Sequence, residues 1–173
     1  MHAQIADRGV RALAKLLDTK SVISILELQD NQIHTEGAKS LARSFKNNQA
    51  LVSINLRLNR MGDEGCKAVC DALRNNATLE RLDLTANAAG SQTASSLVAL
   101  LKGNINLREL DLSCNAFGAE GGMQLRKAIE ASMTLQLVDM RQAGATPDDE
   151  MQIAEAMRMR QEKRDRAKVL TKS

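Results

Sequence analysis

Aromatic side chains are nearly absent from this chain of 173 residues, which has no Trp, no Tyr and two Phe. Proteins that read single-stranded nucleic acid stack successive bases on aromatic rings. Interfaces that carry most of their binding energy in a few residues are often anchored by Trp and Tyr. The composition therefore disfavours a nucleic-acid partner and an interface built on aromatic anchors.

Cysteines and long apolar runs are also scarce. The three cysteines, Cys66, Cys70 and Cys114, form no disulfide framework, and an odd number is typical of a reducing compartment. No segment reaches the roughly 20 apolar residues that cross a bilayer, and the N-terminus lacks a signal-peptide pattern. The net charge of +3 is too small to demand a polyanionic partner. We expect a cytoplasmic or cytoskeletal protein with no membrane partner.

A repeated motif dominates what is present. Residues 107–115 read L-x-x-L-x-L-x-x-N, the motif returns at 23–31, 51–59 and 79–87, and a weaker copy occupies 135–143. The copies begin at residues 23, 51, 79, 107 and 135, so that each interval is 28 residues. A fixed period over four intervals indicates a repeat architecture in which each unit stacks on its neighbours.

Each unit combines a strand with a helix. Its first nine residues have apolar positions one and two apart, as in a buried strand, whereas Gly65, Val69 and Leu73 show the four-residue spacing of a helix. Residues 1–22 are in phase with the helical half alone. After the last strand, Thr146 and Pro147 mark a helix start, and a capping helix over about 147–168 is predicted. We therefore predict one α/β solenoid domain over residues 1–173.

Two sets of residues are expected to shape the helix starts. Asp7, Thr35, Asp63 and Ser91 occupy equivalent positions at the predicted helix starts, and each can accept a bond from an early helical N–H. Glycines follow two residues later in most units, where a close backbone approach leaves no room for a side chain. Thr93 breaks this glycine rule, and we expect local looseness there.

The Asn that closes each motif is expected to be structural. Its amide offers both a donor and an acceptor, which can satisfy backbone groups in the bend after the strand and in the next coil. This ladder consists of Asn31, Asn59, Asn87 and Asn115.

Charged side chains are predicted to line one face of the sheet. The fifth position of each motif is expected on the concave face and holds Glu27, Asn55, Asp83, Asp111 and Asp139. Neighbouring acids at strand spacing repel unless a counter-charge is near, and Arg57, Arg81 and Arg141 are expected on the same face, with Glu109 at position three. The row could bind a partner with basic groups, or it could simply keep the concave face hydrated. Position three also holds Ile25 and Leu137, which place an apolar spot at each end.

The motif and its period resemble the ribonuclease-inhibitor-like class of leucine-rich repeats. The resemblance covers residue 1 to about residue 157. It implies a right-handed horseshoe with a parallel sheet on the concave side, helices outside and protein partners.

The C-terminus is similar to one flagellar family, the leucine-rich-repeat subunit of the nexin–dynein regulatory complex. The similarity lies in Val138-Asp139-Met140-Arg141, then Glu150, Ile153 and Ala154, and a run ending in Arg164-Asp165-Arg166-Ala167. It implies a non-catalytic scaffold in the axoneme of cilia or flagella, whose partners are other subunits of that complex. The alternatives are a small-GTPase regulator of the Ran activator type, although those proteins carry an acidic C-terminus, and a fragment of an innate immune sensor.

A basic stretch ends the predicted capping helix. Its cations are Arg158, Arg160, Lys163, Arg164 and Arg166, interspersed with Glu162 and Asp165. Opposite charges three or four residues apart can pair along a helix, so that the stretch can be a solvated helix. The alternative is docking onto an acidic surface such as tubulin.

No residue pattern predicts catalysis, a metal or a cofactor. Cys66 and Cys70 lie four apart, but no second ligand pair completes a metal site, and packing is favoured. Cys114 is a candidate free thiol. Only two His are present and no glycine-rich phosphate loop occurs, so that we predict a non-enzymatic protein.

The N-terminal edge of the sheet is expected to need cover. The first strand, in residues 23–28, is preceded by half a repeat, and an open strand edge presents unpaired N–H and C=O groups. A partner or a further segment is predicted to cover residues 1–28, and whether Met1 is the native start stays open.

Overall fold

Strands and helices alternate along the chain, and the computed structural model describes residues 5–18 and 22–170, with side chains up to residue 167. The elements in order are α1 (Asp7–Asp18), β1 (Ile25–Glu27), α2 (Thr35–Phe45), β2 (Ser53–Asn55), α3 (Gly62–Leu73), β3 (Arg81–Asp83), α4 (Ser91–Gly103), β4 (Glu109–Asp111), α5 (Gly118–Ala131), β5 (Leu137–Asp139) and α6 (Pro147–Leu170).

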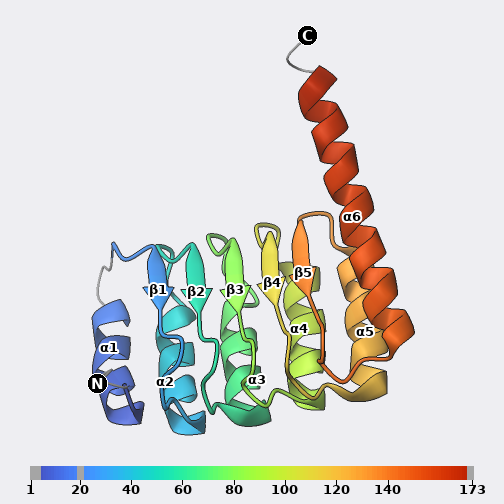
Figure 1. The fold of residues 1–173 in the computed structure, drawn as a ribbon. Helices are drawn as coiled ribbons and strands as arrows, with labels where there is room; N and C mark the ends of the chain where they lie inside the picture. Colours follow the sequence, from blue (N-terminus) through green and yellow to red (C-terminus); the bar gives the residue numbers. More distant parts are fainter. Residues whose placement is uncertain (1–4, 19–21, 171–173) are drawn as a thin grey trace.

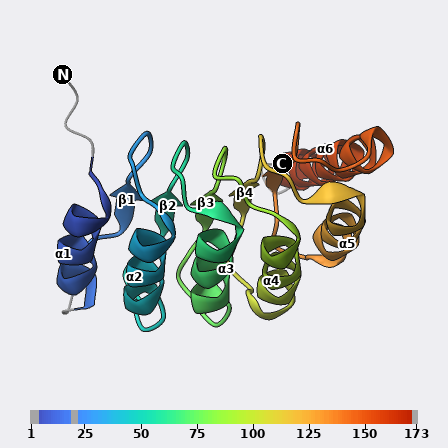
Figure 2. The same cartoon turned by 90° about the horizontal axis from the view of Figure 1, so that it is seen from below.

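The strands form one parallel sheet in chain order, β1-β2-β3-β4-β5. Residues one period apart are partners, so that Leu26 lies beside Ile54 and Ile54 beside Leu82. Helices α1 to α5 form a second layer on one side of the sheet (Figures 1 and 2). The predicted solenoid with a parallel sheet and outer helices is confirmed.

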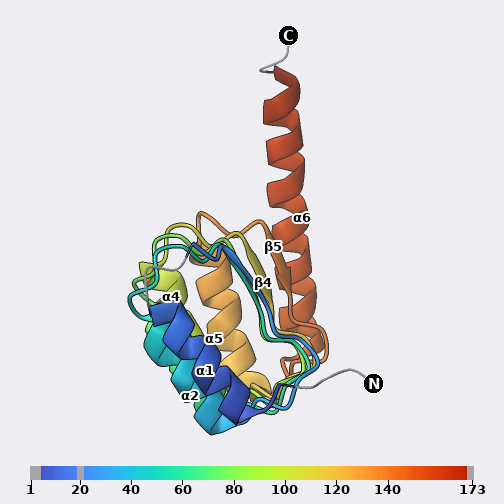
Figure 3. The same cartoon turned by 90° about the vertical axis from the view of Figure 1, so that its left-hand side faces the viewer.

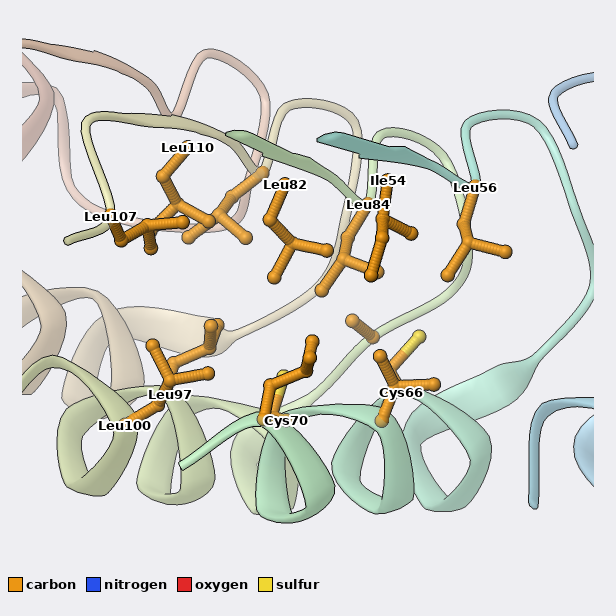
Figure 4. Close-up of a cluster of buried hydrophobic side chains, with 14 of the residues drawn as sticks. Ile54, Leu56, Cys66, Cys70, Leu82, Leu84, Leu97, Leu100, Leu107 and Leu110 are labelled. Carbon is orange, nitrogen blue, oxygen red and sulfur yellow. The ribbon is translucent and has the colours of Figure 1, made fainter. Parts of the chain in front are cut away.

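The core fills the space between the two layers. Figure 4 shows Leu82 and Leu84 reaching from the sheet toward Cys70 and Leu97 on the helices, and all four side chains are fully buried. Each buried leucine contributes about 1.5–3 kcal/mol relative to an exposed one. The repeat therefore builds one continuous core, because each coil covers the apolar face of the next.

Cys66 and Cys70 belong to this core and have the packing role that their spacing favoured. Both are fully buried, and burial, with a smaller effect of the Asp63 charge, raises the pKa of Cys66 to about 12. Residues 5–18 and 22–170 contain no group of three or more His, Cys, Asp or Glu side chains placed to hold a metal ion.

The Asn ladder links backbone groups of adjacent coils. The Asn59 amide nitrogen donates to the carbonyls of Leu56 (2.9 Å) and Leu28 (2.8 Å), and its oxygen accepts from the Ile33 N–H (3.1 Å). Asn87 and Asn115 repeat the donor bonds one period later. Each amide thus joins two strand ends.

A second ladder, which the sequence analysis missed, lies at the other end of the coils. The Asn76 oxygen accepts from the N–H groups of Thr78 (3.0 Å) and Leu79 (2.8 Å), while its nitrogen donates to the Asn48 carbonyl (2.8 Å). Asn104 repeats these bonds and donates to the Asn76 carbonyl (2.8 Å). Asn76 and Asn104 therefore each tie the end of a helix to the preceding coil.

Two of the predicted capping residues, Asp7 and Asp63, accept bonds from the start of the next helix in the chain. Asp63 lies in α3, yet its carboxylate accepts from the N–H groups of Gly90 (2.9 Å), Gln92 (3.1 Å) and Thr93 (2.8 Å) at the start of α4. Asp7 likewise accepts from the His34 N–H (2.8 Å) before α2. The first turn of each helix lies beside the first turn of the next helix in the stack. The carboxylate therefore caps the following helix and couples the two repeats.

Thr93 is well packed, and the expectation of looseness there is wrong. It is fully buried, and its hydroxyl donates to the Asp63 carboxylate (2.7 Å). The equivalent Gly65 has the close approach that was predicted, because a Cβ there would lie 3.0 Å from the Ala38 Cβ. The larger Thr93 side chain is accommodated because its hydroxyl donates to the Asp63 carboxylate of the preceding coil.

The bend after each strand contains a residue in the left-handed region that is not glycine. These residues are one period apart, with φ from 52° to 57°, at Asp30, Leu58, Ala86, Cys114 and Gln142. A non-glycine residue costs about 1 kcal/mol or more in this region. The N–H of each of the first four donates to a carbonyl of the next coil, which helps to hold it there.

Helix α6 is the long C-terminal helix that was predicted, and it extends past the solenoid (Figures 1 and 3). The Thr146 hydroxyl accepts from the Asp149 N–H (3.2 Å), and Asp149 pairs with Arg126 of α5 at 2.7 Å. Ile153 and Met157 are buried against the last coil. Within the described part of the chain, no helix has both the length and the apolar character to cross a bilayer.

Candidate functional site on the concave surface

The concave surface is lined by side chains from the third and fifth positions of the motif. Glu27, Asn55, Asp83, Asp111 and Asp139 are successive partners in the sheet register. Each of the three Asp carboxylates accepts from the N–H two residues later, as Asp111 does from Ser113 (3.0 Å). This local bond fixes the carboxylate at the strand end and supports a structural role beside any binding role.

The three arginines of this surface differ in the ion pairs that they make. Arg141 donates through Nε to Asp139 (3.0 Å), which supplies the counter-charge expected there. Arg81 pairs with Glu109 on the neighbouring strand at 2.6 Å, not with the Asp row. Arg57 is exposed and makes no ion pair with any side chain described in the structure. Its guanidinium is therefore the cation on this surface that is most open to a partner.

The Asp139 carboxylate of this surface is held in its ionised form. Hydrogen bonds from Arg141, outweighing a smaller opposing effect of burial, hold the pKa of Asp139 below its usual range. A general acid needs the opposite, a carboxyl whose pKa is raised toward neutrality. Fixed charges of both signs on an open sheet are suited to binding a polar surface.

Two shallow hollows lie over β3 to β5. One, of about 330 Å³, is lined by Arg57, Asp111, Ser113, Cys114 and Arg141 among others. The other, of about 140 Å³, is bordered by Arg81, Glu109 and Leu137 with their strand neighbours. Both are open to solvent, so that they can receive side chains of a partner protein but do not enclose a small molecule.

A corner forms where β5 meets α6. A hollow of about 210 Å³ there is lined by Leu137 to Arg141 from the strand and by Glu150, Ile153 and Ala154 from the helix. Leu137 is 59% exposed. The corner adds an apolar contact to the charged surface, and the position-three apolar spot expected from the sequence lies in it. No feature of the sequence predicted that α6 would lie over β5.

Cys114 lies on the rim of this surface. It is exposed, and its thiol donates to the Gln142 side-chain oxygen at 3.4 Å. The other two cysteines are buried, so that Cys114 is the thiol that a labelling reagent reaches first.

The basic stretch of α6 divides into two parts, and Arg160 requires a correction. Its guanidinium donates to the carbonyls of Ile129 (2.9 Å), Glu130 (2.8 Å) and Leu135 (3.1 Å). Arg160 therefore caps the C-terminal end of α5 and fastens α6, because the last carbonyls of a helix lack partners within it. It is not available to a partner as predicted.

The other cations of α6 lie on its surface. Arg158 pairs with Glu155 (3.4 Å) and Glu162 (3.7 Å), which is the self-complementary pairing expected of a solvated helix. Lys163 and Arg166 are exposed, whereas Arg164 is half-buried and donates to Gln161. Lys163 and Arg166 are thus the cations of this segment best placed to meet an acidic partner.

The N-terminal edge exposes apolar side chains. Val22 is 93% exposed and Ile25 of β1 is 60% exposed. Cover of this edge by a partner or a further segment stays a prediction, and part of the region concerned, residues 1–4 and 19–21, lies outside the described residues.

Comparisons with known proteins agree with this architecture. A family model described as Leucine Rich repeat matches residues 21–42, 47–70 and 103–125. The fold is a leucine-rich-repeat solenoid. No sequence among the curated proteins matches the chain.

Solved structures with a similar fold include one from leiomodin-1 and one from tropomodulin. Actin-binding site 2 of leiomodin-1 superposes with a TM-score of 0.71 at 16% identity, covering 94% of each chain. The tropomodulin C-terminal domain of Caenorhabditis elegans gives a TM-score of 0.53 at 19% identity, covering 78% of this chain and 98% of that one. At these identities the likeness extends to the fold alone.

Proposed function

We propose that this leucine-rich-repeat solenoid is a non-catalytic interaction module that holds another protein in the corner between the concave sheet and α6. The observation that carries the proposal is the combination of an open charged surface with the exposed Leu137 at its end. The hollows on this surface are shallow, and the ion pair between Arg126 and Asp149 holds α6 as a fixed wall. A rigid wall lowers the entropic cost of binding.

For the assembly, we propose the axoneme of cilia or flagella, as part of a complex like the nexin–dynein regulatory complex. The support is the sequence resemblance of the C-terminus. The residues that carry its first part, Val138 to Arg141, Glu150, Ile153 and Ala154, are also the residues that line the corner between β5 and α6. A binding surface is where such a resemblance is expected to concentrate.

The test is recovery of axonemal proteins from ciliated cells. Tagged wild-type protein is compared with a variant carrying Arg57→Glu, Arg81→Glu and Leu137→Asp, and with a control carrying Lys46→Glu on the helix side. We expect the wild type and the control to recover dynein-regulatory subunits and the concave variant to lose them. Equal recovery by all three would refute the proposed surface, and recovery of none would refute the axonemal assignment.

A second candidate is an actin-containing assembly, and one observation favours it. The structure with a TM-score of 0.71 is an actin-binding site of leiomodin-1. Co-sedimentation with actin filaments separates the candidates, because binding that the concave variant abolishes would replace the axonemal proposal. Neither the Ran activator alternative nor the immune-sensor alternative is supported by a feature of the described residues.

A further inference from the structure

The ladder at the helix ends is broken between the last two coils. Asn76 and Asn104 each donate to the carbonyl of the preceding ladder residue (2.8 Å in both cases). The next position is Ser132, whose shorter hydroxyl bonds instead to Thr134 and to the N–H of Leu135, at 3.4 Å.

A second tie between coils is lost at the same place. The Thr78 hydroxyl reaches back to the Leu51 carbonyl (2.8 Å), and the Asn106 amide donates to Ala77. The equivalent Thr134 shares its hydroxyl with Ser132. The junction between α4 and α5 therefore lacks both of the side-chain bonds that tie the preceding coils together.

A groove opens at this junction. It has a volume of about 680 Å³ and is lined mainly by α4, α5 and the loops after them. Its floor includes Val98, Leu101 and Ala128, and at its mouth Ile105 is 74% exposed and Met133 is 96% exposed. Helices α4 and α5, which line most of it, belong to the helix layer on the side of the sheet opposite the concave surface (Figure 2).

The charge at the groove is positive. Lys102 and Lys127 line it, and neither makes an ion pair with any side chain in the described part of the chain. Elsewhere on the helix layer, Lys67 pairs with Asp71 at 2.6 Å and Lys39 with Glu64 at 3.3 Å. The two groove lysines thus flank an apolar surface, and no acidic residue is among the residues that line it.

We infer that this groove is a second docking site, for an amphipathic helix of a partner protein that carries acidic side chains beside its apolar face. Apolar anchors at i, i+3 and i+7 would replace the water over Ile105 and Met133, as in other helix-in-groove complexes. Carboxylates beside those anchors would reach Lys102 and Lys127, which fixes the direction of the helix. Because the site is on the other layer, its occupant can be present while the concave surface holds a different protein.

The probe for this inference is a fluorescent amphipathic peptide with Leu at i, i+3 and i+7 and Glu on either side of that stripe. Binding to the whole chain is followed by anisotropy. Two matched peptides carry Lys in place of Glu or Ser in place of Leu. We expect saturable binding of the Glu peptide and at least about tenfold weaker binding of both matched peptides.

The site is located with exposed residues, whose substitution leaves the core intact. Met133→Asp and the double variant Lys102→Glu with Lys127→Glu should each weaken the Glu peptide by about tenfold or more. Arg57→Glu on the concave surface and Lys163→Glu on α6 should leave its affinity unchanged. Circular dichroism checks that each variant is folded.

Three results would overturn the inference. One is equal binding of the Glu and Lys peptides, and another is loss of binding in Arg57→Glu but not in Met133→Asp. The third is concentration-dependent self-association that Met133→Asp abolishes in sedimentation velocity, because the occupant would then be a second copy of this chain. Failure of the concave proposal leaves these measurements unaffected.

Discussion

Replacement of Asp63 by Ala tests the coupling between coils. In the structure this carboxylate belongs to α3 but accepts four hydrogen bonds from α4 and the residue before it: three N–H groups at 2.8–3.1 Å and the Thr93 hydroxyl at 2.7 Å. The substitution therefore removes the cap of a helix in another repeat.

The expected magnitude follows from these bonds. Loss of an N-cap side chain costs about 0.5–2 kcal/mol, and hydrogen bonds to a charged group contribute about 1.5–3 kcal/mol. Thr93 is fully buried, so that its hydroxyl would lose a partner that water replaces poorly. We expect Asp63→Ala to lower the free energy of unfolding by about 2–4 kcal/mol in urea titrations followed by circular dichroism.

The effect should depend on pH in a defined direction. Partial burial raises the pKa of Asp63, but the hydrogen bonds from Thr93, Gly90 and Gln92 together lower it by a larger amount. The resulting pKa of Asp63 therefore lies below the usual value. A lowered folded-state pKa contributes stability that is fully present above the unfolded pKa of about 3.9 and is lost as the pH falls through the folded pKa. Asp63→Asn should therefore lose stability at pH 7 and flatten the acid limb of the stability profile.

The matched control is Glu64→Ala, at the adjacent position. Glu64 is exposed and pairs with Lys39 at 3.3 Å, an interaction worth about 0–1 kcal/mol. If Asp63→Ala costs no more than Glu64→Ala, or if Asp63→Asn leaves the acid limb unchanged, the cap between coils contributes nothing and the reasoning fails.

Three further predictions concern the ties between coils. Asn76→Ala should lower the free energy of unfolding by about 2–4 kcal/mol in urea titrations, because two N–H groups and one carbonyl lose their partner; a loss below 1 kcal/mol would contradict it. Ser132→Asn should raise the midpoint of thermal unfolding, adding about 0.5–1.5 kcal/mol through the missing bond to the preceding coil, and an unchanged midpoint would show that the ladder cannot be extended. Arg160→Met should speed amide hydrogen exchange at the end of α5 and cost about 1–3 kcal/mol, whereas Lys163→Met should stay within about 0.5 kcal/mol; equal effects would remove the role assigned to Arg160.

Most of the fold could be predicted from one regularity. The 28-residue period places Leu26, Ile54 and Leu82 side by side in the sheet, because each coil must present its apolar residues at the same angle to bury them. The start of α6 could also be predicted, since Thr146 and Pro147 are local helix-start signals that do not depend on the rest of the chain.

The contacts between coils were less accessible. Asp63 carries the signature of a cap, but the sequence does not say that the nearest free N–H groups belong to the next helix. Arg160 appeared to be one cation among several, and its contact with the end of α5 depends on the angle at which α6 packs. Asn48, Asn76 and Asn104 are also 28 residues apart, but they lie outside the leucine motif, and the spacing alone does not say which backbone groups they bind.

The sequence predicted which residues line the concave surface, but it did not predict how their side chains pair. The register was expected, yet which arginine pairs with which acid depends on side-chain reach, so that Arg81 selects Glu109. The corner at Leu137 arises from two elements joined by a turn whose direction no motif encodes.

Cross-linking from Cys114 tests the central claim, that the surface between the concave sheet and α6 holds another protein. A photoreactive maleimide is attached to this exposed thiol, since Cys66 and Cys70 are buried, and the labelled chain is irradiated in an extract of ciliated cells. We predict cross-links to one axonemal protein, suppressed by Leu137→Asp and retained in Met133→Asp. Cross-links that persist in Leu137→Asp and disappear in Met133→Asp would contradict the assignment of this surface.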